Sequence, residues 1–197
     1  MSKKVVLLGS GNVAWNLGIL VKRAGHEVLQ VYSRNAATAT ELAYELDTES
    51  TNYLTVLKKD ADIYIIAVND DALPQLAEEL RVNRGVVVHT SGAVPLSVIA
   101  PCAAKTGVMY PLQSLRYGVK EIPGISFLVE GNTETVTREI QAFTESLSPQ
   151  VRHNTAEQRL QMHLAAVLVN NFPNYLYILA ERWCKQNGLD FQQLLPL

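Results

Sequence analysis

A glycine-rich turn between a short apolar strand and a helix is the feature that most constrains this chain. The pattern predicts a strand over residues 5–8 and a helix over residues 13–23. Gly9 allows a tight turn, Gly11 lets the backbone approach a pyrophosphate, and Ala14 lets the helix pack closely on the sheet. The helix N-terminus then faces the phosphates. The predicted dinucleotide-binding turn consists of Gly9, Ser10, Gly11, Asn12, Val13 and Ala14.

The end of the second predicted strand, residues 27–32, indicates which dinucleotide binds. An NAD site usually has Asp or Glu here, because a carboxylate binds the ribose hydroxyls and repels a 2′-phosphate. This chain has Ser33 and Arg34 instead. A guanidinium pairs with a phosphate and stacks on an adenine face. The sequence therefore favours NADP, with a solvated loop cation as the alternative role of Arg34.

Composition limits the remaining possibilities. A chain of 197 residues has room for one α/β domain of about 150 residues and an appendage. The net charge of −2 comes without a basic stripe or a long apolar run, so we expect neither nucleic acid nor a membrane as partner. No signal peptide is visible at the N-terminus, and Cys102 and Cys184 lie in no metal-ligand spacing. We expect a cytoplasmic protein without a metal site that acts on a small-molecule substrate.

Strands and helices alternate along the first three quarters of the chain. Helices are predicted over 36–46, 72–80 and 133–146, and strands over 62–68, 85–89, 108–110, 125–130 and near 151. Nearly continuous apolar runs such as 62–68 are typical of parallel strands that are covered on both faces. The fold class is therefore α/β, a doubly wound and mostly parallel sheet over residues 1–153.

The character of the chain changes at residue 154. Thr155 and Gln158 form a capping-box signal, and a helical pattern runs to about residue 187 with a break around Phe172 and Pro173. Residues 154–197 are predicted to begin a helical domain for substrate binding and dimerisation. Its apolar surface exceeds what one monomer needs to bury, so we expect a homodimer, and we expect further helices after the apolar residues that end at Leu197.

Polar residues follow several predicted strands at the edge where such sheets bind ligands. Val68 ends one predicted strand and Asn69 follows it, where Asn69 is placed to bond the nicotinamide ribose or carboxamide. Asp70 or Asp71 is expected to cap the next helix. His89 is the last residue of the following strand and Ser91 lies just after it, and residues 110–114 stand at the end of the next strand. His89 has two open roles, proton donation or substrate orientation on one hand and a structural histidine on the other.

A polar stripe crosses the predicted C-terminal helix. Its members recur every three or four residues and so share one helical face: Arg159, His163, Val167, Asn170, Asn171 and Asn174. Burying such groups is costly without hydrogen bonds, so the stripe is either a ligand-facing surface or an interhelical network. On the first interpretation His163, Asn171 and His89 are the candidate catalytic residues.

Several segments together resemble a known family. They are Gly-Ser-Gly-Asn-Val-Ala at 9–14, Ala-Val-Asn-Asp at 67–70, His-Thr-Ser-Gly at 89–92, Tyr-Pro-Leu-Gln-Ser-Leu at 110–115 and the helix at 164–176. The chain resembles bacterial Rossmann-like proteins with the domain of unknown function 2520. These proteins are labelled NADP oxidoreductases by analogy with deazaflavin-dependent reductases. The chain is more distantly similar to pyrroline-5-carboxylate reductase, and both resemblances imply NADP binding and a dimer.

One departure from related enzymes limits the chemistry. The β-hydroxyacid dehydrogenases carry a catalytic lysine four residues before an asparagine on this helix, and the corresponding residue before Asn171 is Val167. Two hypotheses remain open. The chain is an NADPH-dependent reductase of a small carbonyl or imine, or a non-catalytic NADP-binding sensor or partner-binding dimer.

Overall fold

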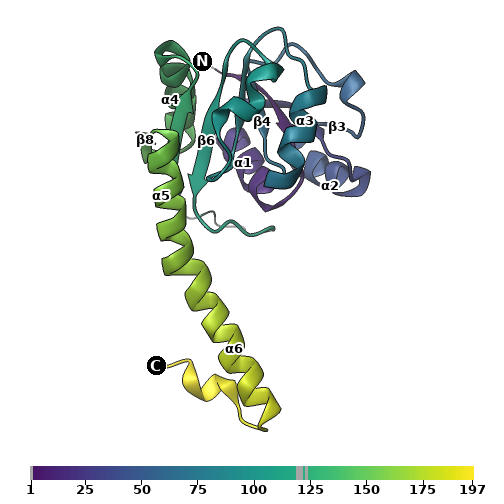
Figure 1. The fold of residues 1–197 in the computed structure, drawn as a ribbon. Helices are drawn as coiled ribbons and strands as arrows, with labels where there is room; N and C mark the ends of the chain where they lie inside the picture. The colour runs from purple at the N-terminus through teal and green to yellow at the C-terminus, as the bar shows by residue number, and fades with distance from the viewer. Residues whose placement is uncertain (1, 119–121, 123) are drawn as a thin grey trace. The chain divides into compact units, whose positions relative to one another are not determined.

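A computed structural model describes residues 2–118, 122 and 124–197 of the chain (Figure 1). The described chain divides into two compact units, of which the first ends at Arg159 and the second comprises Leu160–Leu197. Each unit is described by itself below.

The first unit is built on one eight-stranded sheet. In the order β3-β2-β1-β4-β5-β6-β7-β8, neighbouring strands are parallel except for β6 and β7, which are antiparallel. The strands are β1 (Lys4–Leu8), β2 (Glu27–Tyr32), β3 (Glu49–Thr51), β4 (Ile63–Ile66), β5 (Val86–His89), β6 (Thr106–Leu112), β7 (Ser126–Gly131) and β8 (Val151–His153). This confirms the predicted α/β, mostly parallel architecture.

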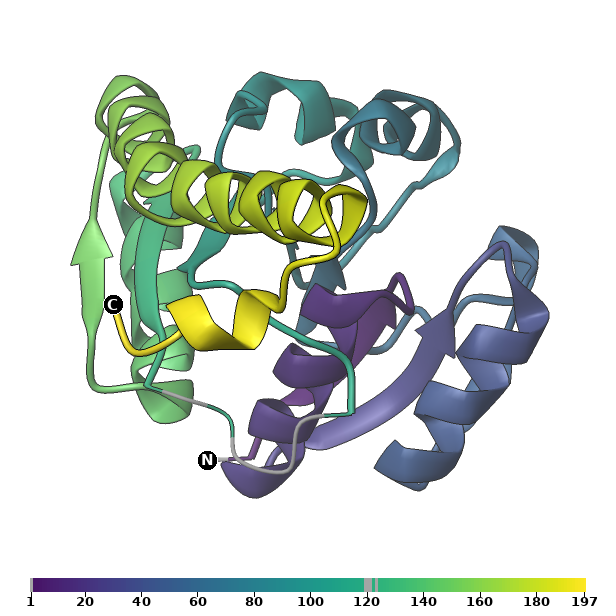
Figure 2. The same ribbon diagram turned by 90° about the horizontal axis from the view of Figure 1, so that it is seen from below.

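Helices cover both faces of the sheet (Figure 2). One face packs against α1 (Asn12–Arg23), α2 (Ala36–Leu46) and α4 (Glu134–Leu147). The other packs against α3 (Leu73–Glu79) and the 3₁₀ segment Leu96–Cys102. The central strands β4 and β5 are buried along their whole length, as their continuous apolar runs predict.

The second unit is helical. α5 (Ala156–Ala166) begins in the first unit and continues into the second. A π-helical segment, Val167–Asn171, then leads into α6 (Phe172–Gln186), and a 3₁₀ turn, Phe191–Leu194, follows. None of the helices described is long and apolar enough to cross a membrane.

Several local expectations are met, while others need correction. The capping box is present, since Gln158 N–H donates to Thr155 Oγ1 and Thr155 N–H to Gln158 Oε1. The predicted caps from Asp70 and Asp71 are wrong, because no side chain caps the turn Asp70–Ala72 or α3. The short edge strand β3 was not predicted from the sequence. Contacts divide the chain after Arg159, within the first turn of α5, and the predicted boundary between residues 153 and 154 stays a prediction.

Candidate functional site

The carboxyl ends of the central parallel strands lie at one edge of the sheet. Leu8, Ile66 and His89 are paired in register across β1, β4 and β5. The loops after these strands therefore begin side by side, and the backbone bonds Ala67 N–H to Leu8 O and Thr90 N–H to Ile66 O fasten them. Ligands of open α/β sheets bind at such an edge.

The two glycines of the first loop differ in what surrounds them. Gly9 has a φ of +129°, and a Cβ there would lie 2.1 Å from the carbonyl oxygen of Ala67, so only glycine fits between the two loops. Gly11 is the N-cap of α1, and a Cβ there would meet no atom within 4 Å. The space above Gly11 is open at the start of a helix, which suits the approach of a pyrophosphate.

Hydroxyl groups and a guanidinium gather at the end of β2. Ser10 Oγ lies 2.9 Å from Ser33 Oγ and 2.7 Å from Thr38 Oγ1. Asn35 caps α2 by accepting bonds from the backbone N–H groups of residues 37 and 38. Arg34 is the second residue after β2, and neither of its sequence neighbours, Ser33 and Asn35, is a carboxylate. Such donors fit a phosphate better than a free ribose diol.

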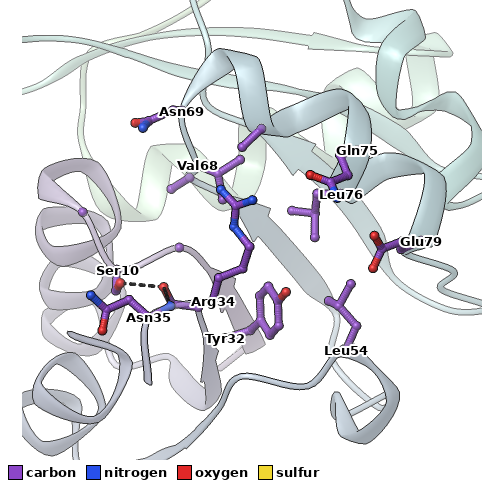
Figure 3. A pocket seen from close by; sticks show the side chains of 15 residues that line it. Ser10, Tyr32, Arg34, Asn35, Leu54, Val68, Asn69, Gln75, Leu76 and Glu79 are labelled. Carbon is purple, nitrogen blue, oxygen red and sulfur yellow. Dashed lines mark hydrogen bonds between the residues drawn. The ribbon is translucent and has the colours of Figure 1, made fainter. Parts of the chain in front are cut away.

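These groups line a cavity of about 360 Å³ (Figure 3). The glycine turn and the end of β2 form one part of its wall, the loop after β4 and α3 the other. The lining residues are Gly9, Ser10, Gly11, Tyr32, Ser33, Arg34, Asn35, Leu54, Ala67, Val68, Asn69, Ala72, Gln75, Leu76 and Glu79.

Two charged groups of opposite sign act on the cavity wall. Burial raises the pKa of the Tyr32 phenol, the Glu79 carboxylate raises it further, and Arg34 opposes both effects. Tyr110, in β6, also has a raised pKa, first through burial and then through the negative charge of Asp70. The negative charge of Asp70, in the turn after β4, therefore acts on a side chain of β6.

Most of the predicted cofactor residues line this cavity. Gly9, Ser10, Gly11, Ser33, Arg34, Val68 and Asn69 do so. Asn12, Val13, Ala14 and Ser91 do not. Ala14 is buried against the sheet, and the Ser91 hydroxyl accepts bonds from the backbone N–H groups of Ala93 and Val94. The role predicted for these four residues stays a prediction.

His89 is enclosed in the protein. It is fully buried, and its Nδ1 accepts a bond from the Ser91 backbone N–H, so the proton of the neutral ring lies on Nε2. Burial, and secondarily the charge of Arg159, lowers the pKa of His89 to about 3 from its ordinary 6.5. An uncharged, enclosed imidazole is a poor proton donor at neutral pH, which favours the structural role of the two left open.

Arg159 fastens the start of α5 to the sheet. Its side chain is only 2 % exposed, and the guanidinium pairs with Glu130 of β7 and donates from Nη2 to the Val94 carbonyl at 3.1 Å. Through Val94 it holds the loop that follows His89 and Ser91. Arg159, the first member of the predicted polar stripe, therefore stabilises the first unit. Its bonds to Glu130 and Val94 offset part of the free energy that burial of its charge costs.

The other members of the stripe belong to the second unit. His163 is half-buried in α5, and Asn171 is exposed at the end of the π-helical segment. Asn170 Nδ2 donates to Asn171 Oδ1 at 3.2 Å. The π-helix also changes the spacing argument, because its wider turn shifts the residues after Val167 relative to a continuous α-helix. The catalytic roles of His163 and Asn171 remain predictions.

Sequence reasoning missed one wall of the cavity. Leu54, Gln75, Leu76 and Glu79 come from a 3₁₀ turn and α3 and carry no motif. Thr38 was also missed, although a hydroxyl in the first turn of the helix after the second strand is a usable signal.

The parallel sheet, the glycine turn and the ligand-binding edge define a Rossmann-like protein. The model of the Rossmann-like domain matches residues 2–113, and that of a domain of unknown function, DUF2520, matches residues 125–197. The chain belongs to this family of Rossmann-like proteins with a C-terminal DUF2520 domain. No protein with a curated description matches it.

Solved structures resemble the chain over nearly its whole length. The "putative NADP oxidoreductase BF3122 from Bacteroides fragilis" is 33 % identical, with a TM-score of 0.91 over 99 % of this chain and 77 % of that one. Pyrroline-5-carboxylate reductase from Streptococcus pyogenes is 16 % identical (TM-score 0.70, 99 % and 74 % covered). A reductive aminase from Aspergillus terreus in complex with NADPH is 14 % identical (TM-score 0.73, 100 % and 71 % covered). The last two show the shared fold alone. The expected link to deazaflavin-dependent reductases receives no support from these relatives.

Proposed function

We propose that the protein is an NADP(H)-dependent oxidoreductase that reduces a small carbonyl or imine by hydride transfer. One observation carries this proposal. The cavity joins the open glycine turn to the end of β2, where Ser33 and Arg34 replace the carboxylate of an NAD site. The Bacteroides fragilis relative is named for NADP, and the pyrroline-5-carboxylate reductase and the reductive aminase are named for chemistry at a C=N bond.

The residues present fit the cofactor. The open space at Gly11 accommodates a pyrophosphate at the start of α1, and Arg34 with the Ser33 and Thr38 hydroxyls surrounds the place of a 2′-phosphate. Asn69 lines the same cavity and supplies amide groups for the nicotinamide ribose or carboxamide. NADPH supplies the hydride when bound.

The proton needs a separate source. His89 is enclosed and uncharged, so we assign proton donation to His163 and substrate orientation to Asn171. Both assignments rest on residue type and on the absence of a lysine at Val167. We keep Asn12, Val13, Ala14 and Ser91 as cofactor-binding residues on the strength of the motifs that contain them.

Replacing Arg34 tests the cofactor assignment. We expect Arg34→Ala to weaken NADPH binding by about 1–3 kcal/mol, because a charged hydrogen bond to the 2′-phosphate is lost, and to leave NADH binding nearly unchanged. Isothermal titration calorimetry with both cofactors measures this. Arg84→Ala is the matched control, since this exposed arginine precedes β5 at the opposite edge of the sheet. An equal loss for both cofactors would contradict the proposal.

The second candidate is a non-catalytic NADP-binding sensor. The enclosure of His89 favours it, because the ligand-binding edge then lacks one of its predicted proton donors. A panel of keto acids and cyclic imines with NADPH separates the two functions. Oxidation of NADPH that requires the substrate supports the reductase, and unchanged NADPH across the panel together with tight NADPH binding supports the sensor.

A further inference from the structure

The part of the cavity beyond Arg34 has a composition of its own. Figure 3 shows Ser10 and Asn35 on one side of Arg34, and Tyr32, Leu54, Gln75, Leu76 and Glu79 on the other. Tyr32, Leu54 and Leu76 line this side of the cavity, so part of its wall is apolar. Gln75 and Glu79 add polar groups from one helix, α3.

Glu79 has no hydrogen bond or ion pair among the described residues. Lys58, Lys59 and Arg81 line a neighbouring cavity that shares Glu79 as part of its wall. Lys58 pairs instead with Glu49, and Arg81 donates to the backbone carbonyls of Ala77 and Leu80. The negative charge of Glu79 raises the pKa of Tyr32, which stands on the wall of the main cavity. The carboxylate is thus free to accept a hydrogen bond from a ligand there.

The position of the adenosine follows from the two ends of the site. The glycine turn holds the pyrophosphate, and Ser33 and Arg34 hold the 2′-phosphate of the adenosine ribose under the proposed function. The base is attached to the neighbouring carbon of that ribose. It therefore extends past Arg34 into the apolar side of the cavity, where its flat faces find Tyr32, Leu54 and Leu76.

We propose that Glu79 selects adenine by accepting a hydrogen bond from its exocyclic amino group. This inference rests on the proposed function, and it names the base that the same site recognises. A carboxylate only accepts hydrogen bonds. Adenine presents an amino donor at position 6, whereas hypoxanthine and guanine present a carbonyl oxygen there, so two acceptors would face each other. Sites that bond a substrate NH reject an analogue lacking it.

Gln75 has a supporting role in the same recognition. Its amide both donates and accepts, so it can bond a ring nitrogen of either type of base and does not discriminate alone. The acceptor-only character of Glu79 therefore makes the difference between 6-amino and 6-oxo purines.

The test compares NADPH with its deaminated analogue, reduced nicotinamide hypoxanthine dinucleotide phosphate. Isothermal titration calorimetry gives both dissociation constants for the unmodified protein and for Glu79→Gln. We expect the unmodified protein to bind NADPH about tenfold or more tightly than the analogue. Glu79→Gln should bring the two affinities close together, because an amide can also donate to the carbonyl oxygen.

Glu78→Gln is the matched control. Glu78 is the exposed neighbour on α3, lines neither cavity, and its variant carries the same change of charge. We expect it to keep the full preference for NADPH. Equal binding of the two dinucleotides by the unmodified protein, or a preference that survives in Glu79→Gln, would overturn the inference while leaving the proposed function intact. Failure to bind either dinucleotide would refute the proposed function as well.

Discussion

His89 makes the stability of the folded protein depend on pH. The ring is uncharged in the folded protein, with a pKa of about 3, whereas the ordinary value of 6.5 applies when the chain unfolds. The unfolded state therefore binds more protons below pH 6.5. The contribution of His89 to stability is complete above that pH and is lost as the pH falls toward 3, at up to about 1.4 kcal/mol per pH unit.

Urea unfolding between about pH 7 and pH 4 measures this loss. This range covers roughly the upper part of the pH interval between the two pKa values of His89. The lowered pKa of His26 acts in the same direction, so the effect of His89 is isolated by a variant. His89→Asn keeps an acceptor for the Ser91 N–H, and we expect its stability to depend less steeply on pH. His153→Asn, at an exposed histidine, is the control variant. An equal slope in His89→Asn would contradict the assigned burial.

At the scale of elements, the two glycines of the glycine turn are expected to affect different properties, Gly9 the stability of the fold and Gly11 the binding of NADPH. Gly9→Ala forces a Cβ against the Ala67 carbonyl at a left-handed φ, so we expect a loss of more than about 2 kcal/mol in the free energy of unfolding. Gly11→Ala meets no protein atom and should leave stability within about 0.5 kcal/mol while weakening NADPH binding. Urea denaturation and calorimetry together measure both variants. Similar destabilisation by both would show that Gly11 serves the fold alone.

The elements also show what the sequence could and could not predict. Buried parallel strands such as β4 were predictable, because their apolar runs are continuous, and the capping box of Thr155 marked the start of α5. The π-helix over Val167–Asn171 was not, since Pro173 predicts a break without its geometry. The wall with Leu76 and Glu79 could not be predicted either, because long-range packing of α3 brings it to the cavity.

At the scale of the whole molecule, the second unit exposes an apolar stripe. Phe172, Leu176, Leu179 and Trp183 follow at spacings of four, three and four residues along α6, which places them on one helical face. All four are exposed, and Leu176 and Trp183 are 63 % and 66 % exposed. Contiguous apolar surface of this kind marks an interaction site. We propose that a second copy of this chain covers it, since a homodimer buries the same stripe on both partners.

Charging the stripe tests this assembly. We expect the unmodified protein to have twice the mass of one chain by light scattering. Leu176→Glu and Trp183→Glu should shift it toward a monomer, because a carboxylate would be desolvated in the interface. Both side chains are exposed in the single chain, so circular dichroism should report an unchanged helix content. Tyr44→Glu, at an 88 % exposed aromatic residue of α2, is the control that stays dimeric. A monomer mass at every concentration of the unmodified protein would refute the dimer and point to a different partner for the stripe.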